Sequence, residues 1–193
     1  MNTPAHALIA AALLAKPNSP GLNTALVAGA LFPDALIVWM FGWERFVNGL
    51  TPEQIFGHSY FTEYWQGWFA VTNSIPLYTA MAVIGLLIGW RMLFGFGAAA
   101  GVHSLLDLPL HHDDGRPHFW PFSEWTYESP VSYWDANHFG TIAGPVEMVI
   151  SLAATFFLLW RFREIWVWVM LWAAMSFEAF IAIASPYAFS GGA

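Results

Sequence analysis

Five long apolar segments constrain the fold of this chain more than any other feature. A transmembrane helix needs about 20 apolar residues to cross roughly 30 Å of hydrocarbon. Five segments approach or reach that length: residues 22–42, 69–90, 92–110, 142–160 and 165–185. A sixth segment, residues 3–15, is too short for a full crossing and is expected to be a tilted helix or one tucked among the others. The sequence therefore predicts a single all-α domain, residues 1–193, that forms a polytopic membrane bundle of five or six transmembrane helices.

The composition supports the membrane assignment and excludes other classes. Hydrophobic residues make up 58% of the chain and charged residues only 10%, whereas about a quarter of the residues in a soluble domain are charged. The net charge of −7, with only six Lys plus Arg, argues against nucleic acid as a partner. The chain has no cysteine, which excludes disulfides, thiolate metal sites and a cysteine nucleophile.

The distribution of basic residues predicts the orientation of the bundle. If all six segments cross, one side carries Lys16, Arg91, Arg161 and Arg163. The other side carries only Arg45 and Arg116. Because cytoplasmic loops are enriched in Lys and Arg, we expect the loops 43–68 and 111–141 to face away from the cytoplasm.

Residues 101–123 (GVHSLLDLPLHHDDGRPHFWPFS) hold the densest group of ligand-capable side chains. His103 and Asp107 are four residues apart, so on a helix they lie on one face. An imidazole and a carboxylate in this arrangement can hold a metal ion or form a pair that activates water. The alternative is a hydrogen bond at a helix end followed by a solvated acidic loop. Pro109 is expected to end the helix.

Polar side chains within the apolar segments are predicted to converge at one depth. Counting 1.5 Å per residue along each helix places the following residues in the outer half of the bundle: His6, Asp34, Asn73, His103, Asp107, Glu147 and Glu178. A charged group inside a membrane costs about 2.5–3.5 kcal/mol on insertion scales. Several such groups at one depth suggest that they share a ligand.

Each of these residues also has a simpler explanation. Asp34 could cap or kink its helix beside a proline, and His6 could be a solvated interface residue. Asn73 could form an interhelical hydrogen bond, which is a common use of Asn in membranes. Glu147 could cap a helix start, and Glu178 could pair with a neighbouring helix.

The outer loops add residues that could complete a site or line its mouth. They are His58, His111, His112, Asp113, Asp114 and His118. Arg116 could bind a phosphate or carboxylate through two hydrogen bonds, or pair with Asp113 or Asp114.

At these residues the chain resembles the YdjM-like family of inner-membrane-associated, metal-dependent hydrolases whose enterobacterial member is described as LexA-binding. The matching elements are Thr3 and His6 (T-x-x-H), Pro33-Asp34, Thr72-Asn73-Ser74, His103 and Asp107 (H-x-x-x-D), and Trp120-Pro121. The resemblance covers residues 3 to about 123. The family has T-H-S where this chain has Thr72-Asn73-Ser74, so one histidine ligand is missing. Asn73 could replace it as a weaker oxygen ligand, His58 or another loop histidine could stand in, or the metal chemistry has been lost.

The residues and the resemblance together imply a metal-dependent hydrolase in a bacterial inner membrane. His6, Asp34, His103 and Asp107, with Asn73 as a weaker ligand, are expected to hold one or two divalent ions, zinc first because imidazole and carboxylate are mixed. Proton transfer is assigned to Glu147, His111 or His112, and the substrate is expected to be a membrane lipid or another phosphoester. The alternative is a non-enzymatic protein, a small transporter, ion relay or scaffold, that keeps the polar cluster for packing or ion passage.

Overall fold

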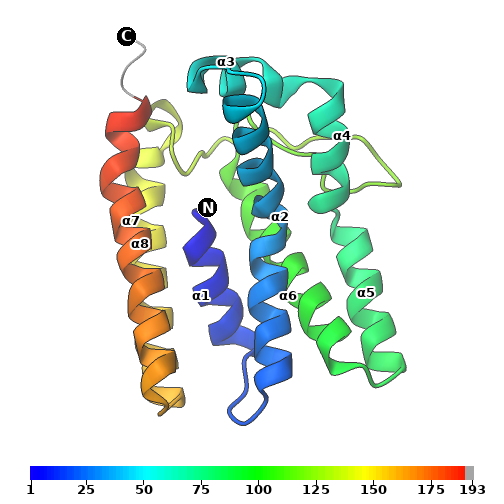
Figure 1. Cartoon of the computed structure of the whole chain (residues 1–193), viewed down its shortest axis with the longest axis vertical. Coiled ribbons are helices and arrows are strands. Elements are labelled where there is room, and N and C mark those ends of the chain that lie inside the picture. The colour runs from blue at the N-terminus through cyan, green and yellow to red at the C-terminus, as the bar shows by residue number, and fades with distance from the viewer. Residues whose placement is uncertain (190–193) are drawn as a thin grey trace.

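The computed structural model describes residues 1–189 and confirms an all-α fold, with no strand in that range. The helices stand side by side with alternating direction (Figure 1). They are α1 (Thr3–Leu14), α2 (Pro20–Phe46), α3 (Pro52–Gly57), α4 (Glu63–Thr72), α5 (Ile75–Leu87), α6 (Arg91–Asp107), α7 (Gly140–Arg161) and α8 (Ile165–Phe189). Three short 3₁₀ turns complete the set: η1 (Ser59–Phe61), η2 (Leu108–Leu110) and η3 (Ala136–His138).

Five helical segments are long and apolar enough to cross a membrane. They are Pro20–Phe46, Glu63–Leu87, Arg91–Leu110, Gly140–Arg161 and Ile165–Ile183. The chain is therefore a membrane protein with five candidate spans, and the sixth predicted segment is not one of them. Helix α1 has 12 residues, or roughly 18 Å at 1.5 Å per residue. It is instead tucked into the bundle, where it contacts α2, α6, α7 and α8.

The second span begins earlier than predicted and is broken in the middle. It starts at Glu63 and divides into α4 and α5 at Asn73 and Ser74. Pro76 lies in the first turn of α5, where its missing N–H costs nothing, and it disfavours the helical conformation of the residue before it. The Ser74 side chain accepts a hydrogen bond from the N–H of Leu77 and so caps the new helix. This break brings the Asn73 backbone into the interior.

The predicted loop 43–68 is largely helical. Helix α2 continues to Phe46, and α3 and η1 fold back over its end. A cluster of buried side chains joins these elements: Met40, Ile55, Tyr60, Trp65 and Phe69. The Trp65 indole N–H also donates to Glu44 Oε1 over 2.8 Å. This outer end of α2 is therefore a rigid cover above the bundle.

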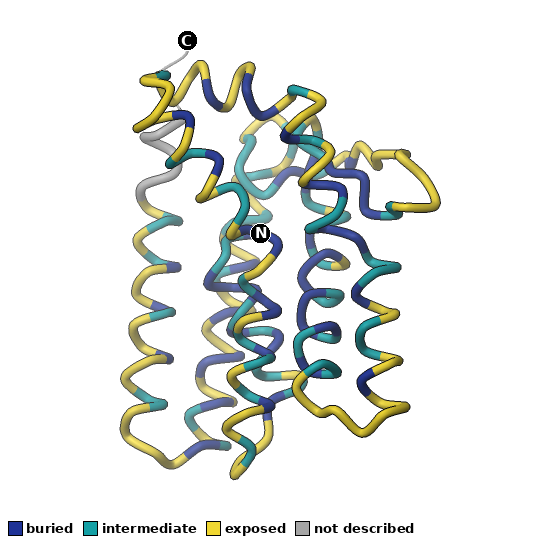
Figure 2. The backbone as a smooth tube through the Cα atoms, turned by 45° about the vertical axis from the view of Figure 1, so that its right-hand side comes forward, coloured by how far each residue is buried: buried dark blue, intermediate teal, exposed yellow. Residues whose placement is uncertain are grey.

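Helix α6 packs closely between α2 and α5 because glycines let these helices approach. A Cβ at Gly29 of α2 would lie 2.2 Å from the carbonyl oxygen of Phe96 in α6. A Cβ at Gly97 would lie 2.7 Å from the carbonyl oxygen of Tyr78 in α5. Small residues at such contacts are typical of membrane helix packing. His103 and Asp107 of α6 are completely buried, and Figure 2 shows the buried interior of the bundle.

The two ends of the bundle differ in their connections. The links 15–19, 88–90 and 162–164 lie at one end, at the bottom of Figure 1. Helix α3, the start of α4 and the long loop before α7 lie at the other end (Figure 1). The long loop was predicted as residues 111–141 and ends at Gly140, where α7 begins. We call the first end the inner end and the second the outer end.

Candidate metal centre

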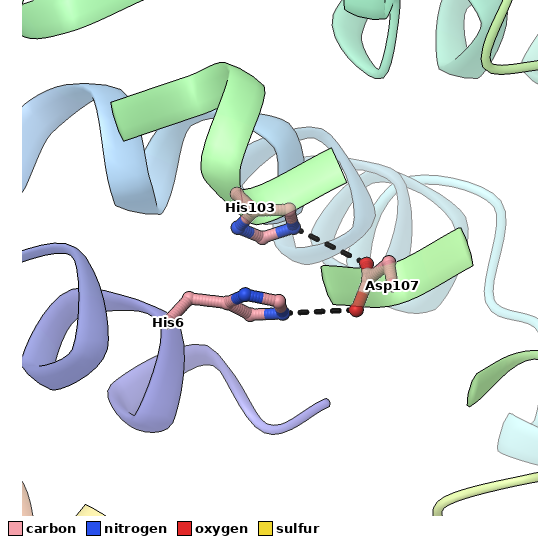
Figure 3. A group of neighbouring side chains, drawn as sticks. All are labelled: His6, His103 and Asp107. Atoms are coloured by element: carbon pink, nitrogen blue, oxygen red, sulfur yellow. Dashed lines mark hydrogen bonds and ion pairs between the residues drawn. The ribbon is translucent and has the colours of Figure 1, made fainter. Parts of the chain in front are cut away.

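Three predicted ligands meet at the level of the first turn of α1. His6 comes from α1, and His103 and Asp107 come from one face of α6 (Figure 3). One ligand atom from each lies within 4.8 Å of the others, and all three residues are fully buried. Asp107 Oδ1 is 2.9 Å from His6 Nε2, and Asp107 Oδ2 is 3.3 Å from His103 Nε2. The two imidazole rings stack with centroids 3.6 Å apart.

The geometry fits a metal ion. Ligand atoms about 2.1 Å from a tetrahedral ion lie about 3.4 Å from one another, close to the spacings seen here. His103 Nδ1 is 2.7 Å from the carbonyl oxygen of Ala30, a contact that makes Nδ1 the donor and leaves a lone pair on Nε2. His103 Nε2 is buried and has no hydrogen-bond partner. Its nearest polar neighbours are the carboxylates of Asp107 and Asp34, at 3.3 and 3.6 Å, and a metal ion bound between these groups would give it a partner.

Asp34 extends the centre from α2. Its Oδ1 is 3.6 Å from His103 Nε2, and its Oδ2 accepts a hydrogen bond of 2.6 Å from the Thr3 hydroxyl. The carboxylate therefore faces the same imidazole nitrogen as Asp107. A fourth ligand position is thus available beside the three that already converge.

Arg116 enters the centre from the outer loop. It was expected to bind a phosphate or carboxylate, or to pair with Asp113 or Asp114. It contacts carboxylates, but those of the centre: its Nη1 lies 3.3 Å from Asp107 Oδ2 and 3.7 Å from Asp34 Oδ1. Burial lowers the pKa of Arg116, but Tyr60 and these two carboxylates outweigh it and raise the pKa above the usual range. The guanidinium stays charged.

Asn73 contacts Arg116 rather than the three converging ligands. Its Oδ1 accepts from Arg116 Nη1 over 2.8 Å, and its Nδ2 donates to the carbonyl oxygen of Phe69 over 3.0 Å. His118 Nδ1 lies 3.1 Å from the backbone oxygen of Asn73. The predicted role of Asn73 as an oxygen ligand stays a prediction, and the structure gives this oxygen another partner.

His111 is held at the edge of the centre by a carboxylate. Its Nδ1 is 2.9 Å from Asp114 Oδ2, and its Nε2 is 3.5 Å from Asp107 Oδ1. The Trp134 indole N–H donates to the same Asp114 oxygen over 3.2 Å, and the Tyr60 hydroxyl donates to the Asp114 carbonyl oxygen over 2.9 Å. Burial lowers the pKa of His111, but Asp107 and Asp114 outweigh it and raise the pKa above its usual value.

The other loop histidines lie away from the centre. The ring of His112 stacks on His138 with centroids 3.5 Å apart, and its Nε2 is 3.5 Å from Glu128 Oε1. His58, expected as a possible stand-in ligand, lies exposed at the end of α3. Of the two loop histidines assigned to proton transfer, only His111 contacts the centre.

Glu147 and Glu178 join the cluster through the first residues of the chain. The backbone N–H of Asn2 donates to Glu147 Oε1 over 2.7 Å, and its side-chain amide donates to Glu178 Oε1 over 3.1 Å. The second carboxylate oxygen of each is buried without a hydrogen-bond partner. The amino group of Met1 lies 2.7 Å from Asp107 Oδ1. The predicted convergence of the intramembrane polar residues is therefore seen, with residues 1–3 linking them.

A cavity of about 500 Å³ lies beside this centre, and we call it the site cavity. His6, His103 and Asp107 do not line it, but their neighbours Asp34, His111 and Arg116 do. Its polar wall includes Asp34, His111, Asp114 and Arg116. Its apolar wall includes Val38 of α2 and Ile181 of α8, and α3 and η1 cover it. The volume is within the range of about 300–1,000 Å³ that is usual for small-ligand sites.

The elements of the resemblance are adjacent in space. Thr3 binds Asp34, and the hydroxyl of Ser74 donates to the carbonyl oxygen of Trp120.

Comparisons with known protein families, with curated proteins and with solved structures return no match for this chain. The fold and the centre therefore define the class by themselves: a membrane protein with five candidate spans in residues 1–189 and a buried His–Asp cluster that could hold a metal ion.

Sequence reasoning missed Tyr60, and it named Arg116 as a possible carboxylate binder without predicting that Asp34 and Asp107 are its partners. Arg116 is the only Lys or Arg in the long outer loop, and that was the one available signal. The hydrogen bond from the Tyr60 hydroxyl to the Asp114 carbonyl oxygen could not be predicted from the residues around Tyr60, because Asp114 lies in a loop distant in the sequence.

Proposed function

We propose that the chain is a membrane-embedded, metal-dependent hydrolase that cleaves a lipid or another phosphoester near the outer interface. The observation that carries the proposal is the convergence of His6, His103 and Asp107 around a buried His103 Nε2 without a hydrogen-bond partner. Zinc is the first candidate because the ligand set mixes imidazole and carboxylate.

The charges of the centre support a bound cation. Asp34, Asp107 and Asp114 carry three negative charges. Asp34 contacts His103, Asp114 contacts His111, and both Asp34 and Asp107 contact Arg116, the one Lys or Arg side chain among them. The Met1 amino group adds a second positive charge beside Asp107, so one negative charge is left among these groups when the imidazoles are neutral. Buried charges are retained only when they are paired, and a cation bound at the centre would pair with it.

When bound, a divalent ion would supply a water of lowered pKa and polarise the scissile bond. His6, His103, Asp107 and Asp34 would hold the ion. Arg116 faces the site cavity and would bind a phosphate oxygen, since its planar guanidinium suits phosphate.

His111 is the best-placed group for proton transfer. Its raised pKa lets the ring hold a proton near neutral pH, so it can give that proton to a leaving oxygen as a general acid. Asp114 fixes the ring with Nε2 toward the centre. Glu147, the other predicted proton carrier, has a free buried oxygen but does not line the site cavity.

The experiment that tests this function is metal analysis of the detergent-purified protein, followed by an assay with a chromogenic phosphoester. We expect about one divalent ion per chain, loss of hydrolysis on chelation, and recovery when zinc is restored. His103→Ala should lose the ion, whereas His138→Ala, which alters the half-buried histidine pair of the outer loop, should keep it. Wild-type protein that holds no ion and is indifferent to chelator would reject the proposal.

One observation favours a second candidate, a non-enzymatic ion or proton relay. Glu147 and Glu178 are buried in α7 and α8, and each has one carboxylate oxygen without a hydrogen-bond partner. Intramembrane carboxylates of this kind often mark ion pathways. Proton flux into proteoliposomes that is lost in Glu178→Gln and kept in His103→Ala would favour the relay.

For the orientation, we propose that the inner end faces the cytoplasm of a bacterial inner membrane. The inner end carries Lys16, Arg91, Arg161 and Arg163, as the positive-inside rule requires. Single cysteines at Ser123 and Arg163 test the orientation because the chain has none of its own. An impermeant thiol reagent on intact cells should label position 123 and spare position 163, and the reverse pattern would overturn the proposal.

A further inference from the structure

A second cavity, of about 630 Å³, lies below the site cavity along the same three helices, and we call it the α1 groove. Its floor is α1, with Ala7, Leu8 and Ala11. Its walls are α2, with Val27 and Ala28, and α8, with Met170 and Ala174. Figure 1 shows α1 between α2 and the α7–α8 pair.

The small side chains of α1 explain why the groove exists. The helix has the sequence TPAHALIAAALL, and alanine side chains leave the floor low between bulkier walls. Trp166 and Met170 of α8, which line the groove, are 61% and 58% exposed. The groove is therefore open sideways, toward the hydrocarbon that surrounds the bundle.

The α1 groove and the site cavity lie on continuous faces of α2 and α8. On α2 the lining residues are Thr24, Val27 and Ala28 for the α1 groove and Asp34 and Val38 for the site cavity. Leu31 lines neither cavity but lies three residues from both Ala28 and Asp34. On α8 the lining residues are Val167, Met170, Leu171, Ala174 and Ile181. Residues three or four apart share one face of a helix. The two cavities share no lining residue, and roughly 9 Å of α2 separates Ala28 from Asp34 at 1.5 Å per residue, a distance that part of a lipid chain would span.

We propose that the α1 groove binds the hydrocarbon chain of a lipid whose phosphate group lies in the site cavity. This inference rests on the proposed function and names its substrate class. The phosphate would face Arg116, the only Lys or Arg that lines the site cavity, while the chain would lie on the alanines of α1. The floor from Ala7 to Ala15 is roughly 12 Å long at 1.5 Å per residue, which suits part of one extended lipid chain.

The shortness of α1 is what joins the two ligand regions. A helix that crossed the whole membrane would fill the space between α2 and α8 in the outer half. Because α1 begins at the level of the metal centre, Thr3 and Asn2 line the site cavity instead. The lipid phosphate can therefore reach the centre sideways, between Val38 and Ile181, without leaving the membrane.

The test uses phosphatidic acid with a photoreactive group at the end of one acyl chain, in nanodiscs that hold the full chain. We expect cross-links in residues 7–15 of α1, which lie between other helices. A matched pair of variants follows: Ala28→Trp would fill the α1 groove, while Ala35→Trp changes an exposed alanine of the same helix that lines neither cavity. Ala28→Trp should reduce the α1 cross-link at least fivefold, and Ala35→Trp should leave it unchanged.

Hydrolysis separates this inference from the proposed function. Ala28→Trp should lose at least tenfold in kcat/KM on long-chain phosphatidic acid and stay within twofold of wild type on a water-soluble phosphoester. His103→Ala should lose hydrolysis of both and keep the α1 cross-link. Cross-links that spread evenly over lipid-facing residues such as Val83, or equal effects of the two Trp variants, would overturn the groove. A specific α1 cross-link in a protein without metal or hydrolysis would overturn the proposed function and leave the groove standing.

Discussion

Two stacked histidine pairs, built from the same residue types, lie in opposite environments. In the inner pair, His6 and His103 have ring centroids 3.6 Å apart and share the carboxylate of Asp107. In the outer pair, His112 and His138 have centroids 3.5 Å apart, and His138 Nδ1 lies 2.5 Å from Asp135 Oδ2. The inner side chains are fully buried, whereas those of His112 and His138 are 23% and 34% exposed.

The difference teaches that the environment, rather than the residue types, makes a candidate site. Water can solvate the outer pair, so its nitrogens and carboxylates need no ligand. At the inner pair, solvation is lost and each charge must find a partner. The sequence neighbours His111 and His112 lie in different environments. His111 contacts Asp107 of the inner group, whereas His112 contacts Glu128 in the outer loop.

The largest expected difference between the two pairs concerns their carboxylates. Asp107→Asn should lower hydrolysis by more than ~100-fold, because supporting residues around a metal ligand already cost about 10–100-fold. Asp135→Asn at the outer pair should stay within twofold. The measurement is kcat/KM on the chromogenic phosphoester with zinc in excess. Equal losses in both variants would remove the functional distinction between the pairs.

The second expected difference is in the free energy of unfolding, and it compares the buried Arg116 with the exposed Arg45. Arg116→Met leaves Asp107 and Asp34 without a cation that lies 3.3 and 3.7 Å away, and breaking a buried pair costs about 3–5 kcal/mol. Arg45→Met removes an exposed side chain that donates to the Leu50 carbonyl oxygen, and should cost under about 0.5 kcal/mol. Denaturation in detergent measures both. A small cost for Arg116→Met would mean that the centre tolerates its carboxylates unpaired.

The third difference is a dependence on pH. Burial lowers the pKa of His118 to about 4 from an ordinary value of 6.5, so the unfolded chain binds a proton that the folded chain refuses. The stability from the neutral ring is therefore full above pH 6.5 and is lost as the pH falls toward 4, by about 3 kcal/mol.

The matched variants isolate this contribution from other titrating groups. His118→Gln should flatten the slope of unfolding free energy between pH 6.5 and 4, whereas His138→Gln at the outer pair should leave the slope as in wild type. Parallel slopes for wild type and His118→Gln would show that His118 titrates alike in both states.

The smallest expected effect concerns Asn73, where the chain departs from the pattern of the family it resembles. Asn73→His places a larger ring where the amide binds Arg116 and the Phe69 carbonyl oxygen. Overpacking of this kind costs about 1–3 kcal/mol, and we expect no gain in zinc affinity. Zinc titration and thermal unfolding decide the matter. Tighter zinc binding would place Asn73 among the ligands after all.

The sequence by itself determined the long apolar helices and the shared helix face of His103 and Asp107. The lengths of the apolar segments predicted the spans because a membrane demands about 20 apolar residues for each crossing, and the five long helices confirm this. The spacing of His103 and Asp107 placed both on one face of α6, and helical periodicity alone requires that. The break at Asn73 and Ser74 was not predicted, since an apolar run conceals where a helix stops.

The tertiary structure decided which polar groups meet. Arg116 reaches Asp107 and Asp34 only because the outer loop folds back into the bundle. Nothing in local periodicity encodes that path, and an acidic neighbour such as Asp113 or Asp114 was an equally good partner on paper. The position of α1 was likewise decided by the tertiary structure, although its short length can be seen in the sequence. Its place between α2 and α8, which leaves a cavity above it and a groove along it, depends on the packing of helices distant in the chain.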